Sequence, residues 1–315
     1  MTHGADIRNV TGITFFVLTG VSDVPKVQVA FFVFVLITYI ITLWGNVTIM
    51  SLILLDHVLH TPMYFFLSNL SCLDIIYTSI TLHRILFSFV SGDKTIVFSD
   101  CMVNLYFFLS VAGIETFILA VMSYDRYVAI CNPLHYQMVM SRRVCIMLSA
   151  LCWVLGFIEM IPVIYIVYEF SCYTSNVINH FFCDLMALMK LSCSDTYLLE
   201  TTLLIVAAEG AIIPFLLIII SYTNIIRAIL KISSATGSHK AFYTCSSHLT
   251  VVFLYFVTAC CLYLKPPSMI TLDSDKLISL VYTAAVPMLN PFIYSLKNKE
   301  VKVALSHLLK HNIAL

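Results

Sequence analysis

Long apolar segments separated by short polar ones run along the whole chain. A helix needs about 20 mostly apolar residues to cross the hydrocarbon core of a bilayer, and seven segments meet this requirement. They cover residues 27–55, 63–89, 99–128, 144–168, 198–229, 243–264 and 274–296. The pattern predicts an all-α membrane protein with one receptor-sized domain over residues 27–296, a seven-transmembrane helix bundle.

The composition agrees with this pattern. Of the 315 residues, 60% are hydrophobic and 11% are charged, and the mean hydropathy is +0.96. A soluble domain of this length cannot bury so much apolar surface, so we interpret the chain as an integral membrane protein. Its 17 basic and 17 acidic residues balance, which argues against a nucleic-acid partner because such binding needs a concentrated basic surface.

The distribution of basic residues predicts the orientation. Lys and Arg gather after the third and fifth spans and in the C-terminal segment, so the N-terminus is predicted outside and the C-terminus in the cytosol of a plasma-membrane protein. Residues 1–26 then form an extracellular tail, which fits the glycosylation sequon that begins at Asn9. Residues 297–315 form a cytosolic tail, in which lysines alternate with apolar residues from Lys297 to Leu309 and predict a short amphipathic helix on the inner leaflet. No removable signal peptide is recognisable, so the first span is expected to act as the targeting signal.

Four of the eleven cysteines fall on the predicted outer side. They are Cys101, Cys172, Cys183 and Cys193. Disulfides persist in this oxidising compartment, and four cysteines allow three pairings among which spacing does not choose. His180 with Cys183 is also a possible metal pair, but two ligands do not make a site.

An adjacent acid and base, Asp125 and Arg126, end the third span. A charge at bilayer depth costs a few kcal/mol or more, so these residues either lie at a membrane edge, with Arg126 reaching to the interface, or are paired within the bundle.

Two carboxyl groups, Asp74 and Glu115, fall near the middle of the second and third spans. With Asn46 and Asn290 at similar depth they are predicted to form a hydrated cluster that holds a small cation such as sodium. The alternative is that both acids are protonated and hydrogen-bonded to their neighbours.

The seventh span ends in Asn290-Pro291-Phe292-Ile293-Tyr294. Proline removes a backbone hydrogen bond and kinks a helix, and here the kink lies beside an amide and one turn before a tyrosine. Such a place is suited to a helix with two alternative packings.

These features together resemble the rhodopsin-like G-protein-coupled receptors. The resemblance rests on Asp125-Arg126-Tyr127 at the end of span three, Asn290-Pro291-x-x-Tyr294 at the end of span seven, Trp153 in span four and Asp74 in span two.

Longer motifs are similar to those of one family in that class, the olfactory receptors. They are Leu59-His60-Thr61-Pro62-Met63-Tyr64-Phe65-Phe66-Leu67-Ser68-Asn69-Leu70-Ser71, Met122 to Cys131 followed by Asn132-Pro133-Leu134-His135-Tyr136, Ser221-Tyr222, Lys240-Ala241-Phe242-x-Thr244-Cys245-x-Ser247-His248-Leu249 and Pro287-Met288-Leu289-Asn290-Pro291. Tyr124 and Phe181-Phe182-Cys183-Asp184 favour the terrestrial-type (class II) branch.

The resemblance implies specific roles. It implies disulfides Cys101–Cys183 and Cys172–Cys193. It implies that Asp125 holds Arg126 in the inactive state and that Arg126, Tyr222 and Tyr294 rearrange when a heterotrimeric G protein docks. The expected G protein is the stimulatory olfactory type, which raises cyclic AMP.

The resemblance also implies a ligand cavity between spans three, five, six and seven. By position it is lined by Phe108, Leu109, Ala112, Gly113, Val206, Ala207, Gly210, Phe256, Ala259, Cys260, Tyr263 and Thr283. This set is almost wholly apolar and suits a small, volatile, weakly polar odorant, although ordinary interhelical packing explains single members equally well. Phe108 stands where aminergic relatives carry an acid, which argues against a cationic amine.

Span six departs from the family pattern. The family usually has Phe-Tyr-Gly where this chain has Tyr255-Phe256-Val257, and serine where it has Tyr243. The tyrosine position therefore lacks a hydroxyl at Phe256, which puts the coupling between ligand and helix in question.

Other functions fit the sequence less well. A channel or transporter that uses Asp74, Glu115, Glu159 and Glu209 as an ion path would be expected to show repeated halves, and none is visible. No metal motif or Gly-x-Ser-x-Gly motif in the spans indicates an enzyme, and no lysine lies deep in span seven, as a light-sensing opsin requires.

Overall fold

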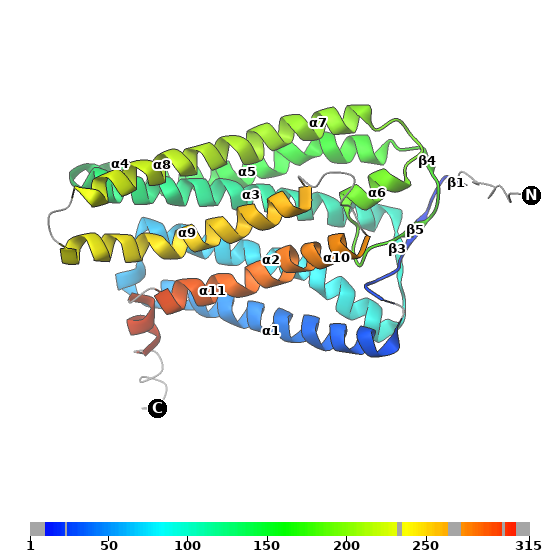
Figure 1. Cartoon of the computed structure of the whole chain (residues 1–315), viewed down its shortest axis with the longest axis horizontal. Helices are drawn as coiled ribbons and strands as arrows, with labels where there is room; N and C mark the ends of the chain where they lie inside the picture. Colours follow the sequence, from blue (N-terminus) through cyan, green and yellow to red (C-terminus); the bar gives the residue numbers. More distant parts are fainter. Residues whose placement is uncertain (1–9, 23, 232–234, 264–271, 298–299, 307–315) are drawn as a thin grey trace, which may run out of the picture.

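Seven helical segments form a bundle in the computed structural model, which describes residues 10–22, 24–231, 235–263, 272–297 and 300–306. Figure 1 shows them side by side along the long axis of the molecule. The first four are α1 (Pro25–Leu55), α2 (Pro62–Ser91), α3 (Phe98–Cys131) and α5 (Arg142–Tyr168). The fifth combines α7 (Tyr197–Ala207), η3 (Ala208–Ile212) and α8 (Ile213–Leu230), the sixth is α9 (Ala235–Tyr263), and the seventh combines α10 (Leu272–Leu280), η5 (Val281–Ala285) and α11 (Val286–Lys297).

The seven predicted spans correspond one to one with these segments. Among the described residues, six of the segments are long and apolar enough to cross a membrane, and α9 contributes a shorter apolar run, Cys245–Cys261. The predicted fold class, an all-α bundle of seven membrane helices, is confirmed.

Local sequence sets where the helices begin and end. Proline stands at the first helical position of α1 and α2 (Pro25 and Pro62), where its missing N–H and fixed φ cost nothing. Gly92 ends α2 in the left-handed conformation, with φ 72°, which glycine adopts without steric penalty.

Two segments contain a π-helical turn instead of a simple kink. η3 and η5 are both π-helical and are each followed at the second position by a proline, Pro214 and Pro287. Proline cannot donate to the preceding turn, and an inserted residue is one way in which a helix accommodates the lost bond.

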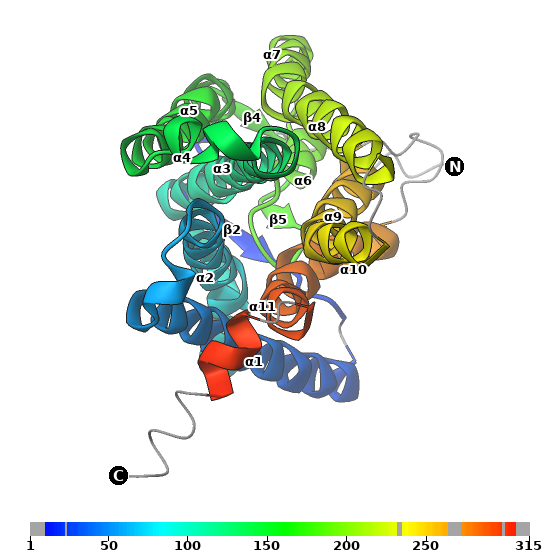
Figure 2. The same ribbon diagram turned by 90° about the vertical axis from the view of Figure 1, so that its left-hand side faces the viewer.

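Helix α3 lies at the centre of the bundle (Figure 2). In the most apolar 18-residue stretch of each helix, 67% of α3 is buried inside the bundle but only 17% of α1. Helix α5 packs closely against α3, because Gly156 has no side chain: a Cβ there would lie 2.4 Å from Cγ1 of Ile114 and 2.9 Å from its backbone nitrogen.

Short strands join the segment before α1 to the loops at one end of the bundle. β2 (Phe15–Leu18) pairs antiparallel with β3 (Thr95–Val97) and parallel with β5 (Val177–Ile178). β1 (Val10–Thr11) pairs with β4 (Cys172–Tyr173), and α6 (Leu185–Leu191) completes this end. We call it the disulfide end, since it carries both disulfides. Residues 10–22 of the segment predicted as a tail are therefore a structured part of this end, whereas Asn9 lies outside the described residues.

The opposite end carries Asp125 and Arg126, and we call it the ion-pair end. It includes η1 (His57–Leu59), η2 (Pro133–His135) and α4 (Tyr136–Val139). A final helix covers residues 300–306, where Val301 and Ala304 are buried and Lys302 is exposed (Figure 2). It has the predicted amphipathic character, while the rest of that prediction, including Lys299 and Leu309, lies outside the described residues.

Candidate functional site

The acid and base at the end of α3 form a buried ion pair. Nη2 of Arg126 lies 3.0 Å from Oδ2 of Asp125, and Nε donates to the same oxygen at 3.2 Å. The Asp125 side chain is fully buried and that of Arg126 is 15% exposed. Arg126 therefore does not simply reach into the interface, and the paired alternative describes this structure.

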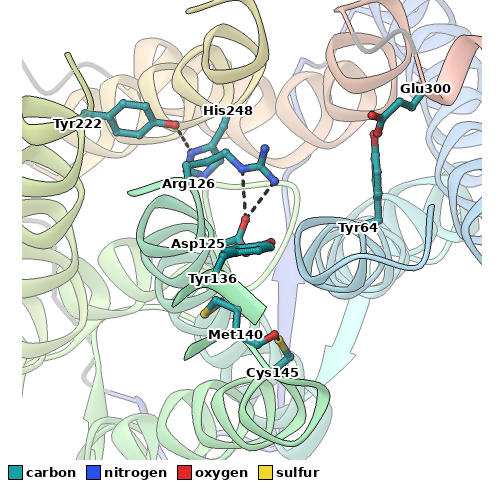
Figure 3. Close-up of polar contacts among 9 residues, drawn as sticks. All are labelled: Tyr64, Asp125, Arg126, Tyr136, Met140, Cys145, Tyr222, His248 and Glu300. Atoms are coloured by element: carbon teal, nitrogen blue, oxygen red, sulfur yellow. Dashed lines mark hydrogen bonds and ion pairs between the residues drawn. The ribbon is translucent and has the colours of Figure 1, made fainter. Parts of the chain in front are cut away.

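Asp125 has a second partner that the sequence did not reveal. The hydroxyl of Tyr136, on α4, donates to Oδ1 of Asp125 at 2.8 Å, as Figure 3 shows. Burial and the negative charge of Asp125 raise the pKa of Tyr136 above its ordinary value, so the hydroxyl keeps its proton at neutral pH. Both carboxylate oxygens of Asp125 are thus occupied, and Arg126 is held toward α4.

A third contact at this end joins α8 and α9. The hydroxyl of Tyr222 lies 2.6 Å from Nδ1 of His248, next to Arg126 in Figure 3. His248 is fully buried. Of the other predicted switch residues, Tyr127 is half-buried and Tyr294 is buried, and the Tyr294 hydroxyl has no hydrogen-bond partner among the described residues.

The mid-bundle polar cluster joins α2 to α11. Nδ2 of Asn290 lies 3.1 Å from both carboxylate oxygens of Asp74, and Glu115 lies close enough to interact with Asp74 electrostatically. Three buried oxygens here have no hydrogen-bond partner in the described part of the chain. They are Oδ1 of Asn46, Oε1 of Glu115 and Oδ1 of Asn290.

The kink of the seventh segment packs closely against α1. Nδ2 of Asn46 donates to the backbone oxygens of Thr42 at 3.1 Å and Pro287 at 3.4 Å. Pro291 is buried against Gly45, where a Cβ would lie 3.0 Å from Cβ of the proline. The bend therefore packs against Gly45, and a larger residue at that position would clash with the proline.

A buried tyrosine links three segments just above this cluster. The hydroxyl of Tyr255, on α9, donates to the Ala112 oxygen of α3 at 2.8 Å and lies 2.8 Å from Oγ1 of Thr116. The hydroxyl of Tyr282, on η5, donates to it at 3.2 Å. The hydroxyl that Phe256 lacks is thus present one residue earlier and ties α9 to α3.

The predicted ligand residues fall into several environments. Phe108 is buried, with its ring 4.9 Å from that of Tyr77 and 5.0 Å from that of Phe182 in the loop after α5. Phe256 packs on Phe215 at 4.7 Å.

The remaining members differ in exposure and contacts. Leu109, Gly210 and Thr283 are buried, Ala112, Gly113, Val206 and Ala259 are half-buried, and Ala207 and Cys260 are exposed. The Thr283 hydroxyl donates to the Ser279 oxygen at 2.7 Å. The side chains of Tyr263 and Tyr243 lie outside the described residues. The ligand set as a whole stays a prediction.

Both disulfides join the pairs that the resemblance implies. Cys101 at the start of α3 bonds Cys183, with Cα atoms 5.5 Å apart, and Cys172 bonds Cys193, with Cα atoms 5.3 Å apart. Cys183 is thereby unavailable to a metal, and the described residues contain no group of three or more His, Cys, Asp or Glu that could hold one. Phe182, next to Cys183 of the first disulfide, packs with its ring 5.0 Å from that of Phe108.

The four membrane acids lie in two groups. Asp74 interacts with Glu115, whereas Glu159 on α5 interacts with Glu209 on η3. The Glu159 carboxyl packs against Gly210, where a Cβ would lie 2.6 Å from Oε1.

Comparison with known proteins identifies the family. The family model for olfactory receptors matches residues 34–312. The chain belongs to the olfactory receptor family. It is 46% identical over 304 residues to olfactory receptor 13F1 of Homo sapiens, covering 96% of this chain and 95% of that protein. It is 45% identical over 309 residues to olfactory receptor 5AP2 of Mus musculus, covering 98% and 97%.

The fold also matches a solved structure. Squid rhodopsin superposes with a TM-score of 0.72 at 19% identity, over 91% of this chain and 82% of that one. This olfactory receptor is accordingly a multi-pass membrane protein of the G-protein-coupled receptor class and not an enzyme. The channel and enzyme alternatives are set aside by the family.

Proposed function

We propose that this olfactory receptor lies in the plasma membrane with the disulfide end outside the cell and the ion-pair end in the cytosol. A small, volatile, mostly apolar odorant binds within the bundle, and the receptor then activates a stimulatory G protein of the olfactory type, which raises cyclic AMP. Two disulfides at one end support the orientation, because such bonds persist in an oxidising compartment.

The observation that carries the proposal is the position of the Tyr255 hydroxyl. It bonds the backbone oxygen of Ala112, a predicted ligand residue, and the next residue along α9, Phe256, is another. A ligand that enters between α3 and α9 therefore acts on the residues that flank this bond. Because the bond joins α3 to α9, breaking it changes the relative stability of two alternative packings of these helices.

The ion-pair end has the arrangement expected of a resting receptor. Arg126 is held by Asp125, which Tyr136 holds in turn. Moving α9 away from α3 would open space beside Arg126 for a G protein, and the Tyr294 hydroxyl, which has no partner among the described residues, is available to bond in that second arrangement. Leaving such a hydroxyl buried and unsatisfied costs about 1–3 kcal/mol, so an arrangement that satisfies it is favoured by that contact.

The cavity chemistry supports an apolar ligand. Phe108 lies between two aromatic rings, and the Thr283 hydroxyl is already engaged with a backbone oxygen. None of the predicted ligand residues carries a charge, so a charged ligand would lose its hydration without gaining a partner.

Sodium is proposed for the mid-bundle cluster. Three oxygens without a partner in the described part of the chain, those of Asn46, Glu115 and Asn290, and the Asp74 carboxylate are the hard oxygen ligands that such a cation takes. A bound cation would offset the charge of the two acids and stabilise the packing of α2 against α11.

A cyclic AMP reporter assay tests the proposal. The receptor is expressed in cells and screened with a panel of volatiles and a panel of charged, involatile compounds. Responding compounds are applied again to Arg126→Ala and to the matched variant Arg142→Ala, which removes a basic residue at the start of α5. We expect a response that Arg126→Ala abolishes and Arg142→Ala retains. An undiminished response in Arg126→Ala would contradict the role given to Arg126, and responses only to charged, involatile compounds would contradict the ligand class.

A further inference from the structure

A cleft of about 620 Å³ opens between α2 and α3 near the disulfide end. None of its lining residues belongs to the predicted ligand cavity or to the switch. Its deeper part is mostly apolar and is formed by Ile75, Ile76, Ser79 and Ile80 of α2, while Ile96 of β3 and Val103 of α3 add apolar lining nearer the disulfide end. Val103 is exposed, so the cleft faces the surroundings of the bundle.

The other part of the cleft is charged. His83 and Arg84 line one wall, and Asp100 and Asn104 line the other. The guanidinium of Arg84 is held in place, because Nη2 donates to the Thr95 oxygen and the group lies 5.6 Å from the centre of the Phe87 ring. Its Nε is buried without a hydrogen-bond partner among the described residues.

The Nε of this guanidinium has no acceptor in the part of the chain that the structure describes. A guanidinium has five N–H donors, and its planar fork matches the oxygens of a phosphate. Asp100 lies in the first turn of α3 and is exposed, so the opposite wall offers an anion to a cationic group.

The two parts of the cleft lie at different depths. Arg84 is seven residues before the end of α2 at Ser91, about 10 Å along the helix, and Ile75 lies nine residues farther in, about 14 Å deeper. The charged part is thus near the membrane interface and the isoleucines of α2 extend into the hydrocarbon region. This gradient fits a molecule with a charged head and an apolar chain.

We infer that the cleft binds one zwitterionic phospholipid. Its phosphate lies on Arg84, its ammonium group faces Asp100, and an acyl chain runs along the isoleucines. Only the choice of leaflet, the outer one, rests on the orientation proposed above.

A second cleft on the same helix provides an internal control. It measures about 390 Å³, lies between α3 and α5, and is lined by apolar and aromatic residues that include Met102, Phe107, Ile161 and Tyr165 but no charged residue. Both clefts take acyl chains by this reasoning, and only the α2–α3 cleft selects a headgroup.

Photolabelling of the full-length receptor in lipid nanodiscs tests the inference. One sample contains a trace of phosphatidylcholine with a photoreactive acyl chain, and a second contains diacylglycerol with the same chain and no phosphate. Labelled peptides are mapped by mass spectrometry. We expect phosphatidylcholine to label the α2–α3 cleft about tenfold more than diacylglycerol, the factor that corresponds to ~1.4 kcal/mol, and the α3–α5 cleft equally.

Charge variants separate the site from a general surface effect. Arg84→Gln should reduce phosphatidylcholine labelling of the α2–α3 cleft to the diacylglycerol level, and Asp100→Asn should weaken it. Lys94→Gln, which removes a cation from the loop between α2 and β3 without lining the cleft, should leave it unchanged. A variant that misfolds would lose labelling at both clefts, so the ratio between them remains informative.

Three results would overturn the inference. They are equal labelling of the α2–α3 cleft by both lipids, loss of labelling in Lys94→Gln as in Arg84→Gln, and displacement of the label by cholesterol but not by unlabelled phosphatidylcholine, which would assign the cleft to a sterol. Vesicles that carry the photolipid in the outer leaflet alone test the orientation separately. Labelling from the inner leaflet would retain the site and contradict the proposed orientation.

Discussion

Removing the Tyr255 hydroxyl is predicted to raise the activity of the receptor without ligand. This hydroxyl contacts the Ala112 oxygen and Oγ1 of Thr116, both at 2.8 Å, and the Tyr282 hydroxyl at 3.2 Å. In Tyr255→Phe these contacts are lost while the ring is kept. The Ala112 oxygen is not left unsatisfied, because Oγ1 of Thr116 also donates to it at 3.1 Å.

The magnitude follows from these contacts. A buried neutral hydrogen bond contributes about 0.5–1.5 kcal/mol net, and the remaining Thr116 bond limits the loss to ~1–2 kcal/mol. If the contacts exist only in the resting packing, the equilibrium shifts toward the signalling packing by roughly 5–30-fold.

Basal cyclic AMP measured at equal surface expression checks this prediction. Tyr106→Phe is the matched control, since Tyr106 donates a similar interhelical bond at 3.0 Å to the Phe157 oxygen but joins α3 to α5 instead of α9. Its basal activity should equal that of the unmodified receptor. If Tyr255→Phe lowered thermal stability yet left basal and ligand-driven signalling unchanged, the hydroxyl would be structural only and the coupling argument would be refuted.

Three further predictions concern packing, pH and sodium. In a thermal-shift assay, Gly156→Ala should destabilise the receptor by ~1–3 kcal/mol, because the new Cβ would lie 2.4 Å from Ile114. The control Gly113→Ala should be neutral or slightly stabilising, because the nearest contact of its Cβ would be 3.8 Å away. Burial raises the pKa of Tyr173, in β4, to about 12 from an ordinary value near 10, so its contribution to stability should be complete below about pH 10 and be lost as the pH rises to 12. Tyr173→Phe should reduce that alkaline loss in denaturation curves, and an undiminished loss would contradict the assignment. Replacing choline with sodium should raise the melting temperature of the unmodified receptor but not that of Asp74→Asn, and equal melting temperatures in both salts would remove the sodium proposal.

The long apolar segments of the sequence and the free-energy cost of placing charges in a bilayer predicted the fold well, because each span must satisfy its own backbone hydrogen bonds within the bilayer. The same reasoning predicted that Asp125 and Arg126 are paired or interfacial, and the structure distinguishes these alternatives through the 3.0 Å ion pair. The disulfide pairing could not be obtained from spacing and came from family resemblance alone.

The polar contacts between helices were not predictable from local patterns. Three such contacts pair Tyr136 with Asp125, His248 with Tyr222 and Tyr255 with Ala112, which are 11, 26 and 143 positions apart. Their pairing depends on how the helices rotate and pack. The only local signals were unusual residue types, such as a histidine within an apolar span and a displaced tyrosine hydroxyl. Strands β1 and β2 were missed for a similar reason, since their partners lie in distant loops.

The central claim is that a ligand in the cavity opens the ion-pair end. The most direct measurement is the distance between spin labels carried by genetically encoded residues at Met138 on α4 and Phe242 on α9, both exposed at this end. A volatile that raises cyclic AMP should also lengthen this distance, and Tyr255→Phe should lengthen it partly without ligand. A distance that stays the same while an active volatile is bound and cyclic AMP rises would contradict the account.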